Sequence, residues 1–280
     1  MFAPFSLNIR GRLYEYCRPA VMGIINATPD SFFAGSRSST ENEIALRVES
    51  MLSAGVDMLD LGAYSSRPGA EDVDESEECR RLETGMKVIR GIDSEIPVSV
   101  DTFRSNVAKK AVCEMGADIV NDISGGDLDP DMWDTIAALK VPYVLMHMRG
   151  TPSTMQSLTD YDDVTADVIK DLSEKLRRLH YMGVSDVIVD PGFGFSKTTE
   201  QNFEMMRNLQ LFSDALEAPV LVGISRKSMI TKSLGISTAE ALPGTIALNT
   251  IALTRGASIL RVHDAAEAVA AVRIYELSTL

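Results

Sequence analysis

The chain has 280 residues, of which 45% are hydrophobic, so it can bury a large core as a single α/β domain over residues 1–280. Its formal net charge of −13 disfavours general binding to nucleic acid or to an anionic membrane, because long-range repulsion opposes both. No run of eighteen apolar residues and no basic-then-apolar opening segment is present, which predicts a soluble, unprocessed protein.

Eight short runs rich in Val, Ile and Leu recur along the chain, and a loop and a segment with helical periodicity follow each of them. Apolar runs of this length are typical of parallel strands that are buried on both faces. In chain order, the predicted strands are 21–25, 56–61, 98–101, 118–121, 143–147, 186–190, 220–224 and 258–262.

Eight helices are predicted between and after these strands, at 41–54, 75–91, 105–115, 131–139, 163–182, 200–211, 239–255 and 265–277. Gly55, Gly116, Gly183 and Gly256 each stop a helix just before the next strand. Eight strands that alternate with helices favour a (β/α)₈ TIM barrel. A doubly wound open sheet is the structural alternative.

Polar side chains stand at nearly every strand end, where a βα barrel carries its active groups. Taken singly, each of these residues can be explained without a function, as a helix cap or as an ordinary loop residue. Together, four of them supply acceptors, an amide and a cation, which suit the edge of a flat heterocycle that carries an amino group, a ring N–H and a carbonyl. This heterocycle set is Asp101, Asn121, Asp190 and Lys227.

A second group of strand-end residues is mostly cationic. Arginine offers forked donors that match phosphate oxygens, and a metal ion can neutralise the remaining charge. This phosphate set is Asn26, Arg67, Arg261 and His263. The glycine pairs at 125–126 and 192–194 lack full phosphate-loop spacing and are interpreted as tight turns. A zinc site has little support, because no third ligand clusters with His147 and His263.

The strand-end motifs resemble those of dihydropteroate synthases, in order, from about Val21 to Asp264. They are NATPDSF at 26–32, SSRPGA at 65–70, SVDT at 99–102, ND at 121–122, MHMRGTP at 146–152, DPGFGF at 190–195, GISRKS at 223–228 and RVH at 261–263. The resemblance implies an enzyme of folate synthesis that joins a pterin methyl pyrophosphate to p-aminobenzoate.

The resemblance also implies residue roles. The heterocycle set would bind the pterin, and the phosphate set would bind pyrophosphate, with Asn26 helping to hold Mg²⁺. We expect Lys227, Arg261, His263 and Asp101 to act in catalysis, with Arg261 the principal stabiliser of departing charge. The residues implied for p-aminobenzoate are Ser66, Pro68, Phe195 and Ser228.

Both substrates are small molecules, and the resemblance suggests a homodimer as the assembly. The three cysteines, Cys17, Cys79 and Cys113, are scattered and odd in number. They are economically explained as reduced thiols, which predicts a cytoplasmic protein.

Two loops depart from the family pattern. Ala34 stands where the family usually has Asp, and residues 62–66 read GAYSS against a usual GGEST. We hypothesise that Asp30 partly replaces the missing carboxylate, and that Ser66 bears on sulfonamide sensitivity.

Three other functions remain open at this point. A pterin-binding methyltransferase barrel shares the Asp and Asn residues but has no use for a pyrophosphate clamp. A non-catalytic paralogue would bind pterin without turnover. An aldolase would use Lys227 to form a Schiff base.

Overall fold

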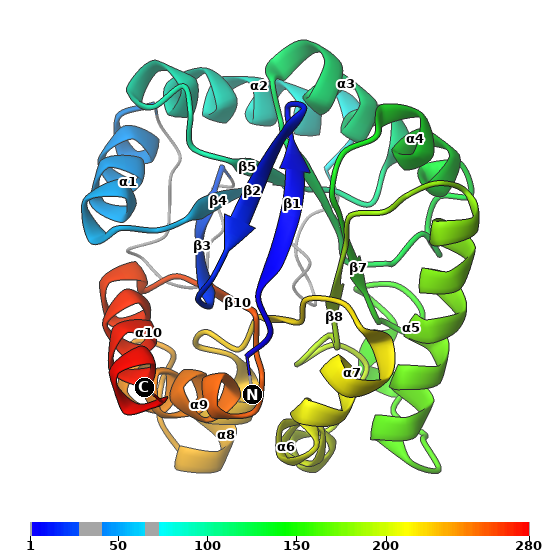
Figure 1. Cartoon of the computed structure of the whole chain (residues 1–280), viewed down its shortest axis with the longest axis vertical. Helices are drawn as coiled ribbons and strands as arrows, with labels where there is room; N and C mark the ends of the chain where they lie inside the picture. The colour runs from blue at the N-terminus through cyan, green and yellow to red at the C-terminus, as the bar shows by residue number, and fades with distance from the viewer. Residues whose placement is uncertain (1, 28–40, 65–72, 280) are drawn as a thin grey trace.

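Figure 1 shows the computed structural model of the chain, which describes residues 2–27, 41–64 and 73–279. Eight parallel strands form one sheet in the order β8-β7-β6-β5-β4-β3-β10-β9. Their bounds are β3 (Ala20–Asn26), β4 (Met58–Gly62), β5 (Val98–Asp101), β6 (Ile119–Asp122), β7 (Tyr143–Met146), β8 (Val187–Asp190), β9 (Leu221–Val222) and β10 (Ile259–Val262).

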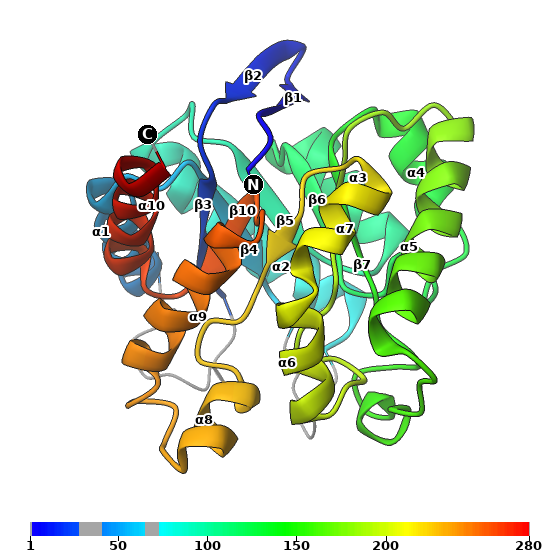
Figure 2. The same cartoon turned by 60° about the horizontal axis from the view of Figure 1, so that its bottom comes forward.

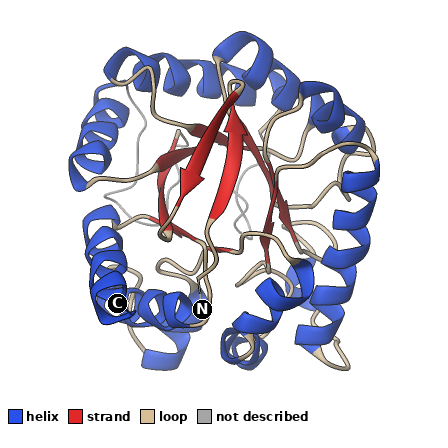
Figure 3. Cartoon of the chain, viewed as in Figure 1, coloured by secondary structure: helices blue, strands red, loops and turns tan. Residues whose placement is uncertain are grey.

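The sheet closes on itself. A parallel bridge joins Val189 of β8 to Val220, just before β9, and the backbone N–H of Val189 donates to Pro219 O at 2.9 Å. Figure 3 shows the strands in the centre with helices around them. The predicted TIM barrel is therefore confirmed, and the open doubly wound sheet is wrong.

Side chains alternate between the two sides of each strand, as the period of two requires. In β4, Leu59 and Leu61 pack in the large cluster with the outer helices, whereas Met58 packs in the cluster inside the barrel. Asp60 has the same parity as Met58 and is fully buried. The sequence thus places a carboxylate in the barrel interior.

The outer layer contains ten α-helices among the described residues. They are α1 (Glu41–Ala54), α2 (Glu75–Ile92), α3 (Ser105–Met115), α4 (Met132–Leu139), α5 (Val164–Tyr181), α6 (Thr199–Arg207), α7 (Leu209–Leu216), α8 (Ser228–Leu234), α9 (Leu242–Thr254) and α10 (Ala265–Thr279). None of the described helices is long and apolar enough to span a membrane.

The helical stretch predicted at 200–211 is two helices. Asn208 leaves the helical conformation at φ −101° and ψ 12°, so α6 ends and α7 begins at the next residue. The amide Nδ2 of Asn208 donates to Thr165 Oγ1 of α5 at 3.1 Å. Asparagine has a low helix propensity, and its bond to another helix holds the side chain in this non-helical position, which accounts for the break.

An antiparallel hairpin, β1 (Phe5–Ile9) and β2 (Arg12–Tyr16), precedes the barrel and was not predicted. Its turn residues, Arg10 and Gly11, both have positive φ, at 52° and 75°, as a tight hairpin turn of the primed type requires. Leu7 and Ile9 pack among the interior side chains of the barrel strands. Figure 2 shows the hairpin at one end of the barrel and α8 at the other.

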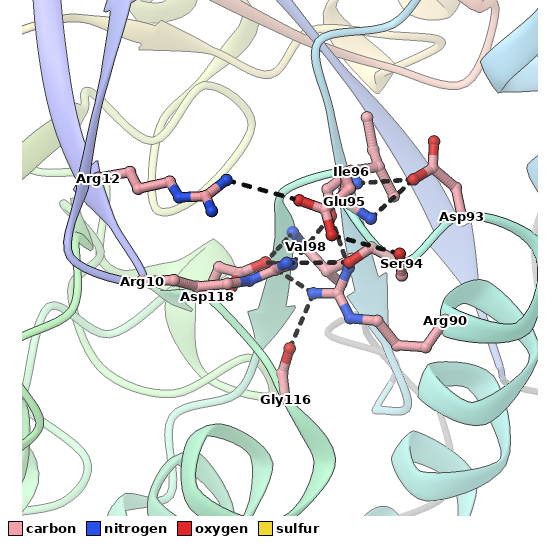
Figure 4. Close-up of polar contacts among 10 residues, drawn as sticks. All are labelled: Arg10, Arg12, Arg90, Asp93, Ser94, Glu95, Ile96, Val98, Gly116 and Asp118. Carbon is pink, nitrogen blue, oxygen red and sulfur yellow. Dashed lines mark hydrogen bonds and ion pairs between the residues drawn. The ribbon is translucent and has the colours of Figure 1, made fainter.

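Ion pairs fasten the tip of the hairpin to the barrel (Figure 4). Arg10 donates to the buried Asp118 from Nε at 2.6 Å and from Nη2 at 2.9 Å. Asp118 also accepts from Arg90 Nη2 at 2.6 Å and from the backbone N–H of Val98 at 2.9 Å. Since Asp118 directly precedes β6, the hairpin covers the N-terminal ends of the strands and leaves the C-terminal ends for function.

Candidate active site

Arg261 of β10 lies between two carboxylates at the C-terminal end of the barrel. Its Nε donates to Asp60 Oδ2 at 2.6 Å, and its Nη2 donates to Asp101 Oδ2 at 2.7 Å. Burial raises the pKa of Asp101, and the guanidinium of Arg261 opposes this shift. The site therefore holds its principal cation in place before any ligand binds.

Asn121 of β6 joins the same cluster, because its Nδ2 donates to Asp60 Oδ2 at 3.2 Å. Gly62 leaves room for the next two members. A Cβ on Gly62 would lie 3.6 Å from Asp101 Cβ and 3.7 Å from Asn26 Oδ1. The ends of β3, β5, β6 and β10 thus bring four predicted site residues together around Asp60.

Asp190, at the end of β8, lies on the other side of Arg261. A Cβ on Gly223 would lie 3.9 Å from Asp190 Oδ2 and 4.0 Å from Arg261 Cβ. Asp190 Oδ1 accepts from the backbone N–H of Gly192 at 2.7 Å. Burial raises the pKa of Asp190, while Lys227 opposes this shift.

Lys227 follows β9 and is the residue that precedes α8. Its Nζ donates to the carbonyl oxygen of Phe193 and lies 4.5 Å from the centroid of the Phe195 ring. Burial lowers the pKa of Lys227 to about 8, with Asp190 opposing the shift. All four residues of the heterocycle set therefore lie at the same barrel end.

Apolar side chains line this end as well. Ile123, Met146, Met148 and Met155 are buried together, and Phe103, Leu128 and Phe195 pack against them. Met146 is the last residue of β7, and the others follow β5, β6, β7 or β8 in the chain. They give the site an apolar wall next to its polar groups, which is what a flat heterocycle or an aromatic ring needs.

His263 follows β10, and Ser225 fixes its ring. The distance from His263 Nδ1 to Ser225 Oγ is 3.1 Å. Arg226 follows Ser225 in the chain. Its Nε and Nη2 each donate to Asp264 at 2.8 Å, so it joins the loops that follow β9 and β10.

Several predicted residues lie outside the described part of the chain. These are Ser66, Arg67 and Pro68 in the second loop, and Asp30 and Ala34 in the first. Ser228 is described and is exposed at the start of α8.

Sequence reasoning missed Asp60, the residue that links Arg261 to Asn121. The available signal was a carboxylate between Leu59 and Leu61, in the middle of the run at 56–61, whereas the other carboxylate of the run, Asp57, lies near its start. A charged residue within a buried strand is rarely tolerated without a partner, so it indicates either an ion pair or a functional site.

The described residues contain no group of three or more His, Cys, Asp or Glu side chains that could hold a metal ion. The predicted metal ligand is the amide oxygen of Asn26 alone. Mg²⁺ keeps several waters and often takes its remaining ligands from substrate phosphates. The donor set therefore fits an ion that binds together with a pyrophosphate.

A model of the pterin binding enzyme family matches residues 22–263. The dihydropteroate synthase of Synechocystis is 42% identical to the chain, over 94% of the chain and 91% of the relative. The chain is 40% identical to the folate synthesis bifunctional protein of Arabidopsis thaliana but spans only 58% of its length.

Two solved structures closely resemble the fold, and each is 34% identical in sequence. The Yersinia pestis dihydropteroate synthase with a sulfonamide drug complex superposes with a TM-score of 0.91, over 98% of this chain and 99% of that one. The Xanthomonas albilineans enzyme in complex with 7,8-dihydropteroate gives 0.85 over the same shares.

Proposed function

Since the chain belongs to the pterin binding enzyme family, among the dihydropteroate synthases, we propose that it is a transferase of folate biosynthesis. It condenses 6-hydroxymethyl-7,8-dihydropterin pyrophosphate with p-aminobenzoate and releases 7,8-dihydropteroate and pyrophosphate. The single observation that carries the proposal is the position of Arg261, between Asp60 and Asp101 at the barrel end.

The heterocycle set binds the pterin edge. The amino group and ring N–H groups of the pterin donate to the carboxylates of Asp101 and Asp190 and to the amide oxygen of Asn121, whose NH₂ is engaged by Asp60. Lys227 donates to the carbonyl side. Met148, in the buried apolar cluster at this barrel end, packs against the flat rings.

The phosphate set receives the charge that develops on the leaving group. The C–O bond of the pterin methylene breaks, and the electron pair departs with pyrophosphate, toward Arg261 and His263. The amine lone pair of p-aminobenzoate then forms the C–N bond, and the amine loses a proton. Removal of one preorganised donor of this kind typically costs about 3 kcal/mol of transition-state stabilisation.

Mg²⁺ is part of the proposal, and when bound it supplies further positive charge to the pyrophosphate oxygens. Asn26 would hold it through the amide oxygen. Arg67 is proposed as a further pyrophosphate contact, and Ser66, Pro68, Phe195 and Ser228 as p-aminobenzoate contacts, on the sequence resemblance alone.

We also propose a homodimer in the cytoplasm. The helix α10 exposes Ile274 and Leu277, one turn apart, with 64% and 66% of their surface accessible. Two neighbouring aliphatic side chains at this exposure suit burial against a second copy. A monomeric mass by light scattering would contradict the dimer.

The cysteines support the cytoplasmic location. Cys17 and Cys113 are free and exposed, a condition that a reducing compartment preserves.

A pyrophosphate-release assay tests the proposed reaction. Release should require both substrates and Mg²⁺, and Arg261→Met should nearly abolish it. The matched control is Arg273→Met, an exposed arginine of α10 that should leave the rate unchanged. Pterin binding without release would support the non-catalytic paralogue, and methyl transfer to a corrinoid would support the methyltransferase.

A further inference from the structure

A second lysine, Lys197, lies in the interior just beyond the heterocycle set. Only 4% of its surface is exposed. Its Nζ donates to His147 Nδ1 at 3.0 Å, to Phe195 O at 3.0 Å and to Gly192 O at 3.1 Å. Within the described part of the chain these partners are uncharged, and no carboxylate pairs with the ammonium.

The β8–α6 loop, residues 191–197, curls around this ammonium group. Gly192 has a φ of +72°, and a Cβ there would lie 2.0 Å from His147 O. The loop backbone therefore rests directly on the end of β7. A buried lysine that donates to both ends of such a curl fixes its shape. Without it, Phe195 O would lose this donor and Gly192 O would keep only the backbone N–H of Phe195, at 3.1 Å.

The same loop holds two members of the heterocycle set. The backbone N–H of Gly192 donates to Asp190 Oδ1 at 2.7 Å, and the carbonyl of Phe193 accepts from Lys227. The Phe195 ring lies under the Lys227 ammonium, 4.5 Å from Nζ to centroid. A shift of this loop would therefore move Asp190, Lys227 and the apolar wall together.

We propose that Lys197, seated on His147, is a positioning residue that sets the geometry of the pterin-binding edge through the β8–α6 loop. The inference rests on the proposed function and adds two residues to it. Neither side chain touches the substrate in this arrangement. Each acts through Asp190, Lys227 and Phe195.

The state of His147 agrees with this geometry. Burial and the neighbouring Lys197 together lower the pKa of His147 to about 2. The ring is therefore neutral, and since an ammonium group can only donate, Nδ1 accepts from protonated Lys197 and the ring proton resides on Nε2. A neutral ring that accepts at Nδ1 can seat the lysine without charge repulsion.

The test uses four variants of the full chain. Lys197→Met removes the donors, and His147→Leu removes the ring acceptor. His147→Asn is the conservative partner, because an asparagine Oδ1 can occupy the place of Nδ1. Lys175→Met controls for the loss of a buried lysine, since Lys175 is 7% exposed and pairs with Asp127 and Asp171 instead of with the carbonyls of the β8–α6 loop.

The readouts are the Kd of 6-hydroxymethyl-7,8-dihydropterin pyrophosphate with Mg²⁺, by calorimetry, the KM of p-aminobenzoate, and Tm. Lys197→Met and His147→Leu should raise Kd and KM by roughly tenfold or more, since a displacement of about 1 Å is enough to do so. His147→Asn should stay close to wild type. Lys175→Met should lower Tm alone.

The proposal is overturned if Lys197→Met lowers Tm as Lys175→Met does but keeps wild-type Kd and KM. If Lys197→Met does not fold, the comparison of His147→Leu with His147→Asn decides. Equal Kd and KM values for these two variants overturn the proposal. A wild-type protein that binds pterin without turnover would refute the proposed reaction. The Kd comparison would still test the positioning role.

Discussion

A single oxygen atom of Asp60 links Arg261 of the phosphate set to Asn121 of the heterocycle set. One oxygen, Oδ2, accepts from both Arg261 and Asn121, and the residue is fully buried. Asn121 must point its NH₂ group toward Asp60, so its carbonyl oxygen is left to accept from a ligand. Pterin orientation and pyrophosphate stabilisation should therefore fail together when this carboxylate is lost.

We predict that Asp60→Asn lowers kcat/KM by an amount equivalent to roughly 2 kcal/mol or more, because one partner of a buried charge pair is removed. The control is Asp57→Asn, which removes a partly exposed ion pair to Arg18. Steady-state kinetics check both. A wild-type kcat/KM in Asp60→Asn would contradict the linking role.

Lys227 predicts an alkaline limit on pterin binding. Burial lowers its pKa from 10.5 to about 8, with Asp190 opposing the shift. The ammonium therefore loses its proton, and with it the attraction for the pterin carbonyl, as pH rises through about 8. Pterin affinity should fall above this pH.

Lys227→Arg is the matched variant, because a guanidinium stays protonated throughout. This variant should bind the pterin more weakly than the wild type does. Its Kd should nevertheless stay constant over the pH range in which the Kd of the wild type rises. Calorimetric titrations from about pH 6 to about pH 9.5 span the relevant range. A wild-type Kd that is constant across it would exclude Lys227 as the titrating donor.

The sequence predicted the heterocycle set because each member lies at or just past the end of a strand, and strand order alone brings such residues to one end of a barrel. Lys197 could not be found in this way. Its partner His147 is fifty positions away, and their contact depends on how the β8–α6 loop folds back. Contacts that depend on loop shape leave no periodic signal in the sequence.

At the scale of elements, the hairpin β1–β2 stabilises the barrel from the end opposite to the site. Arg10 makes two charge-assisted hydrogen bonds to Asp118, whereas Arg12 lies 4.0 Å from Glu95 with both side chains exposed (Figure 4). Arg10 and Arg12, on either side of Gly11, thus form ion pairs that differ greatly in their exposure to solvent.

We predict that Arg10→Ala lowers the free energy of unfolding by about 1 kcal/mol, as expected for the loss of partly buried hydrogen bonds to a charged group. Arg12→Ala should change it by less than about 0.5 kcal/mol, because the pair is exposed. Both should keep wild-type kcat/KM. Denaturant titration and kinetics check this, and a large kinetic defect in Arg10→Ala would contradict the separation of the two ends.

The prediction of elements succeeded for the strands of the barrel, which are buried on both faces. Each of the eight predicted strands overlaps an observed one, since a continuous apolar run is a strong signal. The hairpin was missed because its strands mix buried and exposed residues and so lack a continuous apolar run, and because its Arg10-Gly11 turn lacks the usual Asn-Gly or Asp-Gly pair. Helix α8, with seven residues, is too short for helical periodicity to register.

At the scale of the whole molecule, the two barrel ends have different tasks, as is usual for this fold. The N-terminal end is closed by apolar hairpin residues and ion pairs. The C-terminal end carries the charged side chains of the site, and there Asp60 Oδ1 has no hydrogen-bond partner among the described residues. A chain of net charge −13 thus concentrates Arg261, Lys227 and His263 where an anionic substrate would bind.

Fold class was predictable because strand and helix alternate eight times, with a helix-stop glycine at four of the junctions, and this repetition constrains topology more than any single element does. The roles of Arg67 and Ser66 rest on motif resemblance, because these residues lie outside the described ranges.

A crystal structure with 7,8-dihydropteroate and pyrophosphate bound tests the central claim most directly. The pterin should lie against Asp101, Asn121, Asp190 and Lys227, with pyrophosphate within hydrogen-bond distance of Arg261 and His263. A product bound anywhere else, or an Arg261 that still contacts only Asp60 and Asp101 while pyrophosphate is present, would contradict it.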